Sequence, residues 1–270
     1  MKEKTKVLFI SQEITPYLPE TSMSKIGRFL PQGIQEKGKE IRTFMPRFGC
    51  INERRNQLHE VIRLSGMNLI IDDTDHPLII KVASIQAARM QVYFIDNEDY
   101  FHRKHIFVGK DGEEFKDNDE RAIFFARGVL ETTKKLRWAP NIIHCHGWFT
   151  GLVPLIIKKA MNEDPHFAKS KLVYSIYNDD FKSTFSDTFP EKFAMEGIEK
   201  SDYAGLTPFN YENLSKLAIN FSDGIIEGHP DANKNITDYA KASGKPFLKY
   251  HDEETYIDAY NKFYDELMNK

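Results

Sequence analysis

The chain has 270 residues and 31.4 kDa, with 41% hydrophobic and 29% charged residues, which suits one large globular α/β domain and excludes a disordered or fibrous chain. Its formal net charge of −3, its pI of about 6.3 and the lack of an apolar run of roughly 20 residues argue against nucleic-acid and membrane partners. The two cysteines, Cys50 and Cys145, have no metal-ligand or CxxC spacing, which favours a reduced, cytoplasmic compartment.

The first 46 residues have the pattern of a doubly wound sheet. The apolar run at 6–11 predicts a buried strand, and a Pro-rich loop follows at 16–19. A helix is predicted over 24–37, ended by Gly38, because glycine takes the left-handed conformation at a helix C-terminus without strain. The next strand is predicted at 40–45 and is stopped by Pro46.

The middle of the chain is rich in short β segments. They are predicted at 58–64, 67–72, 77–85 and 90–95, separated by turn signals such as Asp72-Asp73. We expect a meander or extra strands beside the parallel core. A long helix then follows over 117–136, with apolar positions at helical spacing.

The alternation of strand and helix returns after Pro140. Strands are predicted at 141–144, 171–176 and 224–227, with helices at 151–161 and 211–218. A terminal helix over 253–268 has a wide apolar face that needs burial. The pattern predicts one domain over residues 1–270. It is a Rossmann-like, doubly wound, mostly parallel sheet with helices on both faces and a small β-rich insertion around 58–95. Helices in 232–268 are expected to pack back on it.

Several segments in order resemble glycosyltransferases of the bacterial glycogen synthase and plant starch synthase family. They are KVLFISQEITPYLPETSMSKIGRFLPQGIQEKGKEIRTFMPRFG near the start, VYFIDNEDYF at 92–101, DNDERAIFFARGVLE at 117–131, APNIIHCHGWFTGLVPL at 139–155, KLVYSIYND at 171–179 and YENLSKLAINFSDGIIEG at 211–228. The resemblance runs from about residue 5 to about residue 228. It implies the N-terminal, acceptor-side half of a GT-B fold, and the family's second domain, which binds most of the ADP-glucose and places the catalytic-site Glu, has no counterpart here.

The family's phosphate loop is degenerate in this chain. Where the family carries Lys-Thr-Gly-Gly, an ungapped reading places Pro19, Glu20, Thr21 and Ser22. Pro19 removes a cation and an N–H group, and Glu20 brings negative charge toward the position of a phosphate. Thr21 and Ser22 take a positive φ less readily than glycine. The resemblance therefore implies weakened binding of the donor pyrophosphate.

The sugar-contacting motifs are also altered. In HCHGWF, the Asp and second His of the family's His-Asp-Trp-His motif are replaced by Gly147 and Phe149, while Trp148 remains. In SIYND, the family's His is replaced by Tyr177 and Asn178 is kept. A candidate glucan cleft remains after the strands, formed by stacking faces and hydrogen-bond partners: Tyr17, Tyr100, His144, His146, Trp148, Tyr177 and Asn178.

Other polar residues have plainer interpretations. His144 and His146 point to one face of a strand, so a metal pair is open, but no third ligand is evident and no metal site is predicted. Arg121 suits a structural salt bridge better than a carboxylate or sugar site. His102 and His105 beside two cations suit a solvated loop better than an anion site. No motif for a cofactor or for another common chemistry is found, and no catalytic residue is assigned.

Three functions remain open, in this order. The first is a catalytically silent glycogen-synthase-like protein that binds α-glucan or a partner enzyme. The second is the acceptor-side half of a split ADP-glucose-dependent glucosyltransferase, with a separate protein supplying the donor-binding domain. The third is another small-molecule enzyme on the same scaffold. We do not expect this chain alone to be active. A tightly packed terminal helix would favour the first function, and an exposed apolar face on that helix would favour the second.

Overall fold

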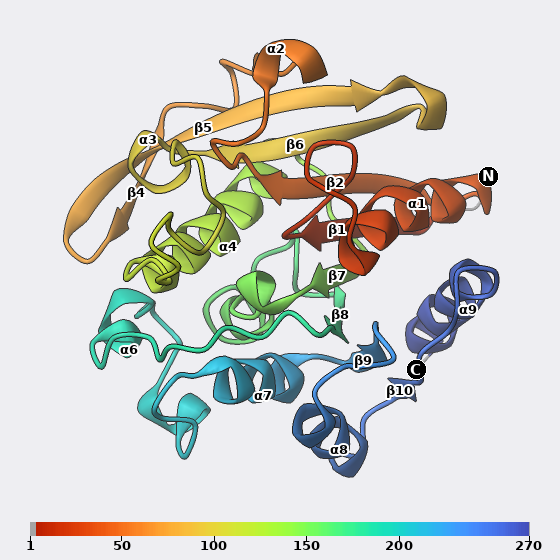
Figure 1. Ribbon diagram of the computed structural model, residues 1–270. Helices are drawn as coiled ribbons and strands as arrows, with labels where there is room; N and C mark the ends of the chain where they lie inside the picture. Colours follow the sequence, from red (N-terminus) through yellow and green to blue (C-terminus); the bar gives the residue numbers. More distant parts are fainter. Residues whose placement is uncertain (1–3, 270) are drawn as a thin grey trace.

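The computed structural model describes residues 4–269, and it shows a twisted sheet with helices on both faces (Figure 1). Across those residues the sheet has ten strands in the order β10-β9-β8-β7-β1-β2-β6-β5-β3, with β4 paired to β5. The parallel strands are β1 (Lys6–Ser11), β2 (Glu40–Pro46), β6 (Met90–Asp96), β7 (Ile142–His146), β8 (Lys171–Ile176), β9 (Gly224–Glu227) and β10 (Phe247–Leu248). The predicted doubly wound, mostly parallel sheet is confirmed.

The β-rich insertion forms the antiparallel edge of this sheet. β5 (Thr74–Ile85) pairs with β6, while β4 (Met67–Ile71) and β3 (His59–Glu60) pair with β5. Asp72 and Asp73 have φ of 50° and 60°, as a tight hairpin turn between β4 and β5 requires. The predicted strand over 58–64 was too long. The Leu64 N–H bonds to the Val61 carbonyl, and that turn ends the pairing after two residues.

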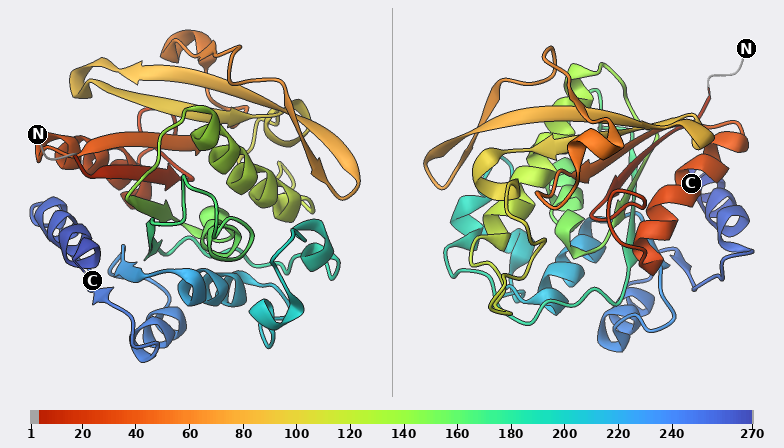
Figure 2. Two further views of the ribbon diagram at one scale, coloured as in Figure 1. Left: turned by 180° about the vertical axis from the view of Figure 1, so that it is seen from behind. Right: turned by 45° about the horizontal axis from the view of Figure 1, so that its top comes forward.

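One face of the sheet is covered by α1 (Ser22–Glu36) and α9 (Tyr256–Met268), which lie side by side in Figures 1 and 2. Gly33 of α1 allows the close approach, because a Cβ there would lie 2.6 Å from Cγ2 of Ile257. The α9 side chains buried in this packing are Tyr256, Tyr260, Phe263, Tyr264 and Leu267. The aromatic residues of the terminal helix are thus packed against the sheet, while Met268 at its end is exposed.

The opposite face is covered by α4 (Asn118–Lys135), α5 (Val153–Leu155) and α7 (Tyr211–Phe221), with α6 (Phe189–Lys192) and α8 (Lys234–Ala242) beside them. The helix predicted over 151–161 is instead α5 followed by a π-helical turn at Ile156–Ala160. Short elements complete the chain: α2 (Glu53–Asn56), α3 (Glu98–Phe101) and 3₁₀ turns at Gln86–Ala88, Trp148–Thr150 and Lys200–Tyr203. No helix within residues 4–269 has the length and apolarity to cross a membrane.

Candidate functional site

The loops that follow the parallel strands meet at the carboxyl edge of the sheet, where open α/β sheets bind ligands. Two hollows at this edge lie on either side of the loop that joins β1 to α1. The first, here called the Tyr17 hollow, has about 560 Å³ and is lined by Tyr17, Pro19, Cys50 and Lys104–Val108. The second, here called the α1–α9 hollow, has about 440 Å³ and is lined by α1, the loop after β9 and the segment before α9. Pro19 lines one hollow and Ser22 lines the other.

The N-terminus of α1 is capped by side chains of its own first turn. The Ser24 N–H donates to Oγ1 of Thr21 over 3.0 Å, and the Thr21 N–H donates to Oγ of Ser24 over 2.8 Å, which forms a capping box. The Thr21 hydroxyl in turn donates to Oε2 of Glu13 over 2.6 Å. Part of the donor capacity of this helix N-terminus is therefore satisfied internally, and a carboxylate lies beside it.

The turn after β7 is built around Gly147. Its φ of 84° and ψ of 165° lie in a region that only glycine adopts readily. The two N–H groups that follow it are held by distant side chains: Phe149 donates to Oε1 of Gln12 over 3.2 Å, and Trp148 donates to Oδ2 of Asp179 over 2.9 Å. A Cβ at Gly147 would lie 2.5 Å from that Gln12 oxygen. The turn thus depends on the absence of a side chain at 147.

Asp179 is the hydrogen-bonding centre of this turn. Its Oδ1 accepts from the Tyr211 hydroxyl over 2.8 Å, and its Oδ2 accepts from the Trp148 N–H. Removal from water raises the pKa of Asp179 to about 6, with these two donors opposing the rise. The carboxylate holds the backbone in place.

His144 and His146 lie side by side under α9, with ring centroids 3.8 Å apart, and both are buried. His144 bonds through Nδ1 to the Tyr264 hydroxyl at 2.6 Å and through Nε2 to Oγ of Ser175 at 2.7 Å. His146 bonds through Nδ1 to the Tyr177 hydroxyl at 2.8 Å, and its Nε2 has no protein partner among the described residues. Burial lowers the pKa of His146 to about 3 and lowers that of His144 well below its ordinary value. Both rings are therefore neutral parts of the core.

Replacing Tyr264 with Phe tests this network. The variant removes the hydroxyl bonded to Nδ1 of His144 and leaves that nitrogen buried without a partner. We expect the free energy of unfolding to fall by about 1–3 kcal/mol, the cost of an unsatisfied buried polar group. Urea denaturation followed by circular dichroism measures the change. Tyr250→Phe, at an exposed position, is the matched control and should leave the unfolding free energy nearly unchanged.

The predicted aromatic cleft residues do not form one open surface. Tyr17, Tyr100, Trp148 and Tyr177 are all 7% exposed or less, whereas Asn178 is exposed. Trp148 packs against Phe107 and Phe181, and the Tyr100 hydroxyl bonds to Glu120 and His76 on the side of the insertion. A glucose ring would stack on these four side chains only after their packing had opened. Their role as glucan contacts stays a prediction.

Arg121 has a structural role that differs from the predicted salt bridge. Its guanidinium is fully buried, donates to the Tyr100 carbonyl and to Oδ1 of Asn118, and is surrounded by four Phe rings: Phe48, Phe101, Phe107 and Phe115, with centroids 5.4–5.8 Å away. Burial lowers the pKa of Arg121 to about 9. Phe101, Phe107 and Phe115 precede Arg121 closely in the chain and Phe48 follows β2, but their spacing has no regular period that would have indicated this cage.

The described residues contain no group of three His, Cys, Asp or Glu side chains placed to hold a metal ion. His102, in the predicted basic patch, lies 3.5 Å from Oδ1 of Asp96, while His105 lines the Tyr17 hollow. The two histidines of this patch therefore lie in different places, His102 beside the Asp96 carboxylate and His105 in the Tyr17 hollow. Lys104 adds positive charge beside Tyr17.

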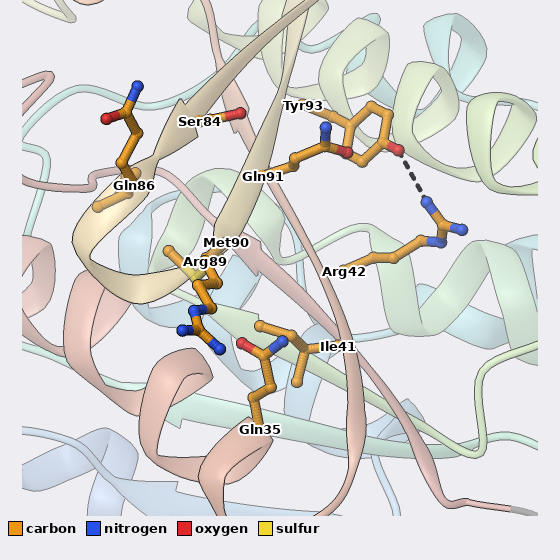
Figure 3. Close-up of a pocket in the computed structure, with 10 residues that line it drawn as sticks. Gln35, Ile41, Arg42, Ser84, Gln86, Arg89, Met90, Gln91 and Tyr93 are labelled. Atoms are coloured by element: carbon orange, nitrogen blue, oxygen red, sulfur yellow. Dashed lines mark hydrogen bonds between the residues drawn. The ribbon is translucent and has the colours of Figure 1, made fainter.

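A third hollow, of about 400 Å³, lies at the opposite, amino edge of the parallel strands and contains two arginines (Figure 3). The Arg42 Nη1 donates to the Tyr93 hydroxyl over 2.7 Å, while Arg89 points the other way, toward Gln35 (Figure 3). Because the two guanidinium groups do not converge, they do not form an anion clamp. The carboxyl edge is the better candidate site.

Comparisons with known proteins agree with this geometry. A sequence profile described as "Starch synthase catalytic domain" matches residues 6–245. The chain belongs to the starch synthase catalytic domain family. It is 38% identical over 174 residues to a glycogen synthase of Chlorobium limicola, covering 64% of this chain and 36% of that protein. It is 32% identical over 240 residues to a glycogen synthase of Chlorobaculum parvum, covering 88% of this chain and 48% of that protein. The chain thus spans about half or less of the length of these relatives.

A solved structure shares the fold. The catalytic domain of starch synthase IV from Arabidopsis thaliana, described as bound to ADP and acarbose, superposes with a TM-score of 0.74 at 16% identity, covering 93% of this chain and 52% of that one. The positions that the resemblance marks as altered lie in two defined pieces of local structure. The loop with Pro19 and Glu20 precedes a self-capped helix, and Gly147 supports a turn in which a side chain has no room.

Proposed function

We propose that this starch-synthase-family chain binds α-glucan and does not by itself transfer glucose from ADP-glucose. The observation that carries the proposal is the capped N-terminus of α1, where Thr21 and Ser24 cap each other and the Thr21 hydroxyl donates to Glu13. A helix N-terminus binds phosphate through free N–H groups and a favourable field. Here the capping box occupies the Ser24 N–H of α1, and the carboxylates of Glu13 and Glu20 would repel a pyrophosphate.

The glucan part of the proposal is supported by kinship. The relatives are glycogen synthases, and the Arabidopsis starch synthase IV structure is described as bound to acarbose as well as ADP. We propose that this chain shares carbohydrate binding with these relatives but not nucleotide binding, because the altered positions are those expected to contact the donor phosphate and the transferred sugar. Phe149 stands where the family has its sugar-contacting His and is fully buried.

A second candidate is the acceptor-side half of a split glucosyltransferase, with a partner protein supplying a donor-binding domain. The chain spans 36–48% of the length of these relatives. Against it, the aromatic face of α9 is buried on the sheet and is not available to a partner. Co-purification of the chain with a protein resembling the second half of glycogen synthase would establish this candidate.

Calorimetric titration with maltoheptaose and, separately, with ADP-glucose tests the proposal. We expect binding of maltoheptaose and no measurable heat from ADP-glucose at millimolar concentration. Cellohexaose, a β-linked chain of similar size, is the control for α-glucan selectivity. Binding of ADP-glucose, or elongation of glycogen by the purified chain, would overturn the proposed loss of transfer. Failure to bind maltoheptaose would overturn the glucan-binding part.

A further inference from the structure

We propose that the α1–α9 hollow is the carbohydrate subsite of this chain and that it holds neutral glucose units against Phe29 and Tyr250. This inference rests on the proposed function, since it places the glucan that the proposed function requires. The hollow lies at the carboxyl edge between α1, the loop after β9 and the segment before α9. It contains none of the seven cleft residues named from the sequence.

The positions of the exposed aromatic rings favour this hollow as the glucan-binding site. The large hydrophobic side chains left exposed within residues 4–269 include two aromatic residues, Phe29 at 48% and Tyr250 at 39%, and both line the α1–α9 hollow. The less polar face of a pyranose ring packs on flat aromatic surface, and water is released from both. The buried rings of Tyr17, Tyr100, Trp148 and Tyr177 offer no such surface in this structure.

The polar groups of the hollow suit hydroxyl groups. Nδ1 of His229 accepts from the Asp231 N–H over 3.0 Å, so the neutral ring carries its hydrogen on Nε2. That Nε2–H has no partner within the described residues and is a donor available to a ligand. Across the hollow, Lys25 and Glu253 form a loose ion pair of 3.6 Å and add a donor and an acceptor. Carbohydrate hydroxyls use donors and acceptors together, as this set provides.

The charge of the lining argues against a nucleotide. Lys25 is opposed by Asp252 and Glu253, so the lysine and carboxylate side chains of the lining carry one more negative than positive charge. Asp252 is committed to the turn that starts α9, where its Oδ1 accepts from Thr255 and Glu254. A phosphate would meet net repulsion here, whereas an uncharged oligosaccharide would not. A volume of about 440 Å³ lies within the usual range of small-ligand sites.

The lining of the hollow comes from two parts of the chain, one inside and one outside the region that matches the family. Phe29 and His229 lie within residues 6–245, which match the family, while Tyr250 and Glu253 lie beyond them. Half of the proposed subsite is thus supplied by a segment outside the family match. α9 fixes that segment in place, because Tyr256 and Ile257 at its start pack on α1 and the sheet.

Titration of maltoheptaose into the full chain and into the single variants Tyr250→Ala and Phe29→Ala tests the subsite. We expect each variant to bind at least tenfold more weakly, with unchanged thermal melting, because both side chains are exposed. Ile62→Ala, 75% exposed on another part of the surface, is the control for loss of an exposed apolar side chain. Lys104→Ala and Val108→Ala test the Tyr17 hollow in the same way.

The outcomes separate this inference from the proposed function. Loss of affinity in Tyr250→Ala and Phe29→Ala, but not in the Ile62, Lys104 and Val108 variants, supports the subsite. Full affinity in Tyr250→Ala and Phe29→Ala overturns the subsite and leaves glucan binding in place. If the unaltered chain does not bind maltoheptaose, both the subsite and the glucan-binding function are wrong. Competition of ADP-glucose with maltoheptaose at this hollow would contradict the neutral-ligand assignment.

Discussion

Lowering the pH from 7 to 4 is expected to reduce the contribution of His146 to the free energy of unfolding by about 3 kcal/mol. The pKa of the buried ring is about 3, and an unfolded histidine titrates near 6.5. Between these two pH values the unfolded chain therefore binds a proton at His146 and the folded chain does not. Because this folded pKa is depressed, the stabilisation is full above about pH 6.5 and is lost as the pH falls toward 3. His144 acts in the same direction, since burial and its neighbour His146 hold its pKa well below the ordinary value.

Urea denaturation at half-unit pH intervals measures this loss. Asp179 opposes it, because its pKa of about 6 makes the folded chain bind a proton between about pH 4 and pH 6. The contribution of His146 is therefore taken from the difference between the unaltered chain and His146→Asn, whose amide can still pair with the Tyr177 hydroxyl. His59→Asn, at an exposed position on β3, is the matched control. Parallel pH profiles for the unaltered chain and His146→Asn would contradict a neutral buried ring.

Restoring the family's Asp at position 147 is expected to destabilise the fold by about 3–5 kcal/mol. The φ of 84° and ψ of 165° at Gly147 are accessible to glycine with little strain and to other residues at a high cost. An added Cβ would also lie 2.5 Å from Oε1 of Gln12 and 2.8 Å from Oδ2 of Asp179. The new carboxylate would then face the existing one. Chemical denaturation of Gly147→Asp measures the loss.

A second glycine separates backbone strain from steric overlap. Gly205 has a φ of 77° and open space around it, so Gly205→Asp should lose less stability than Gly147→Asp. The double variant Gly147→Asp with Gln12→Ala should recover part of the loss, because the closest atom is removed. Equal stability of Gly147→Asp and the unaltered chain would mean that the turn can take the family's conformation. Regained transferase activity in that variant would contradict the proposed silence of the chain.

The elements that the sequence predicted well are those with local signals at both ends. The predicted strands at 171–176 and 224–227 coincide with β8 and β9, since each apolar run is bounded by polar or glycine residues. Gly38, at φ 91°, ends the turn after α1 as expected. The π-helical turn at 156–160 has no such local signal, because a run of apolar and basic residues also suits an ordinary helix.

The candidate site was less predictable because exposure depends on distant segments. Tyr177 follows a strand and was expected to face a ligand, yet its hydroxyl reaches His146 and its ring lies against Gly228. Tyr250 had no motif around it, and its exposure beside Phe29 follows from the position of α9. The degenerate phosphate loop at residues 19–22 was inferred from residue types alone and stays a prediction. The capping box between Thr21 and Ser24 in this loop could be found only from the structure.

The bond between His144 and Tyr264 joins residues separated by 120 positions, and the same helix covers Val7 and Phe9 of the first strand. During synthesis these strand residues leave the ribosome long before α9 does. One apolar face of the nascent sheet therefore stays uncovered until α9 has emerged. Such late, non-local closure slows folding and exposes intermediates to aggregation. Nascent chains of this protein should accordingly engage chaperones until α9 docks.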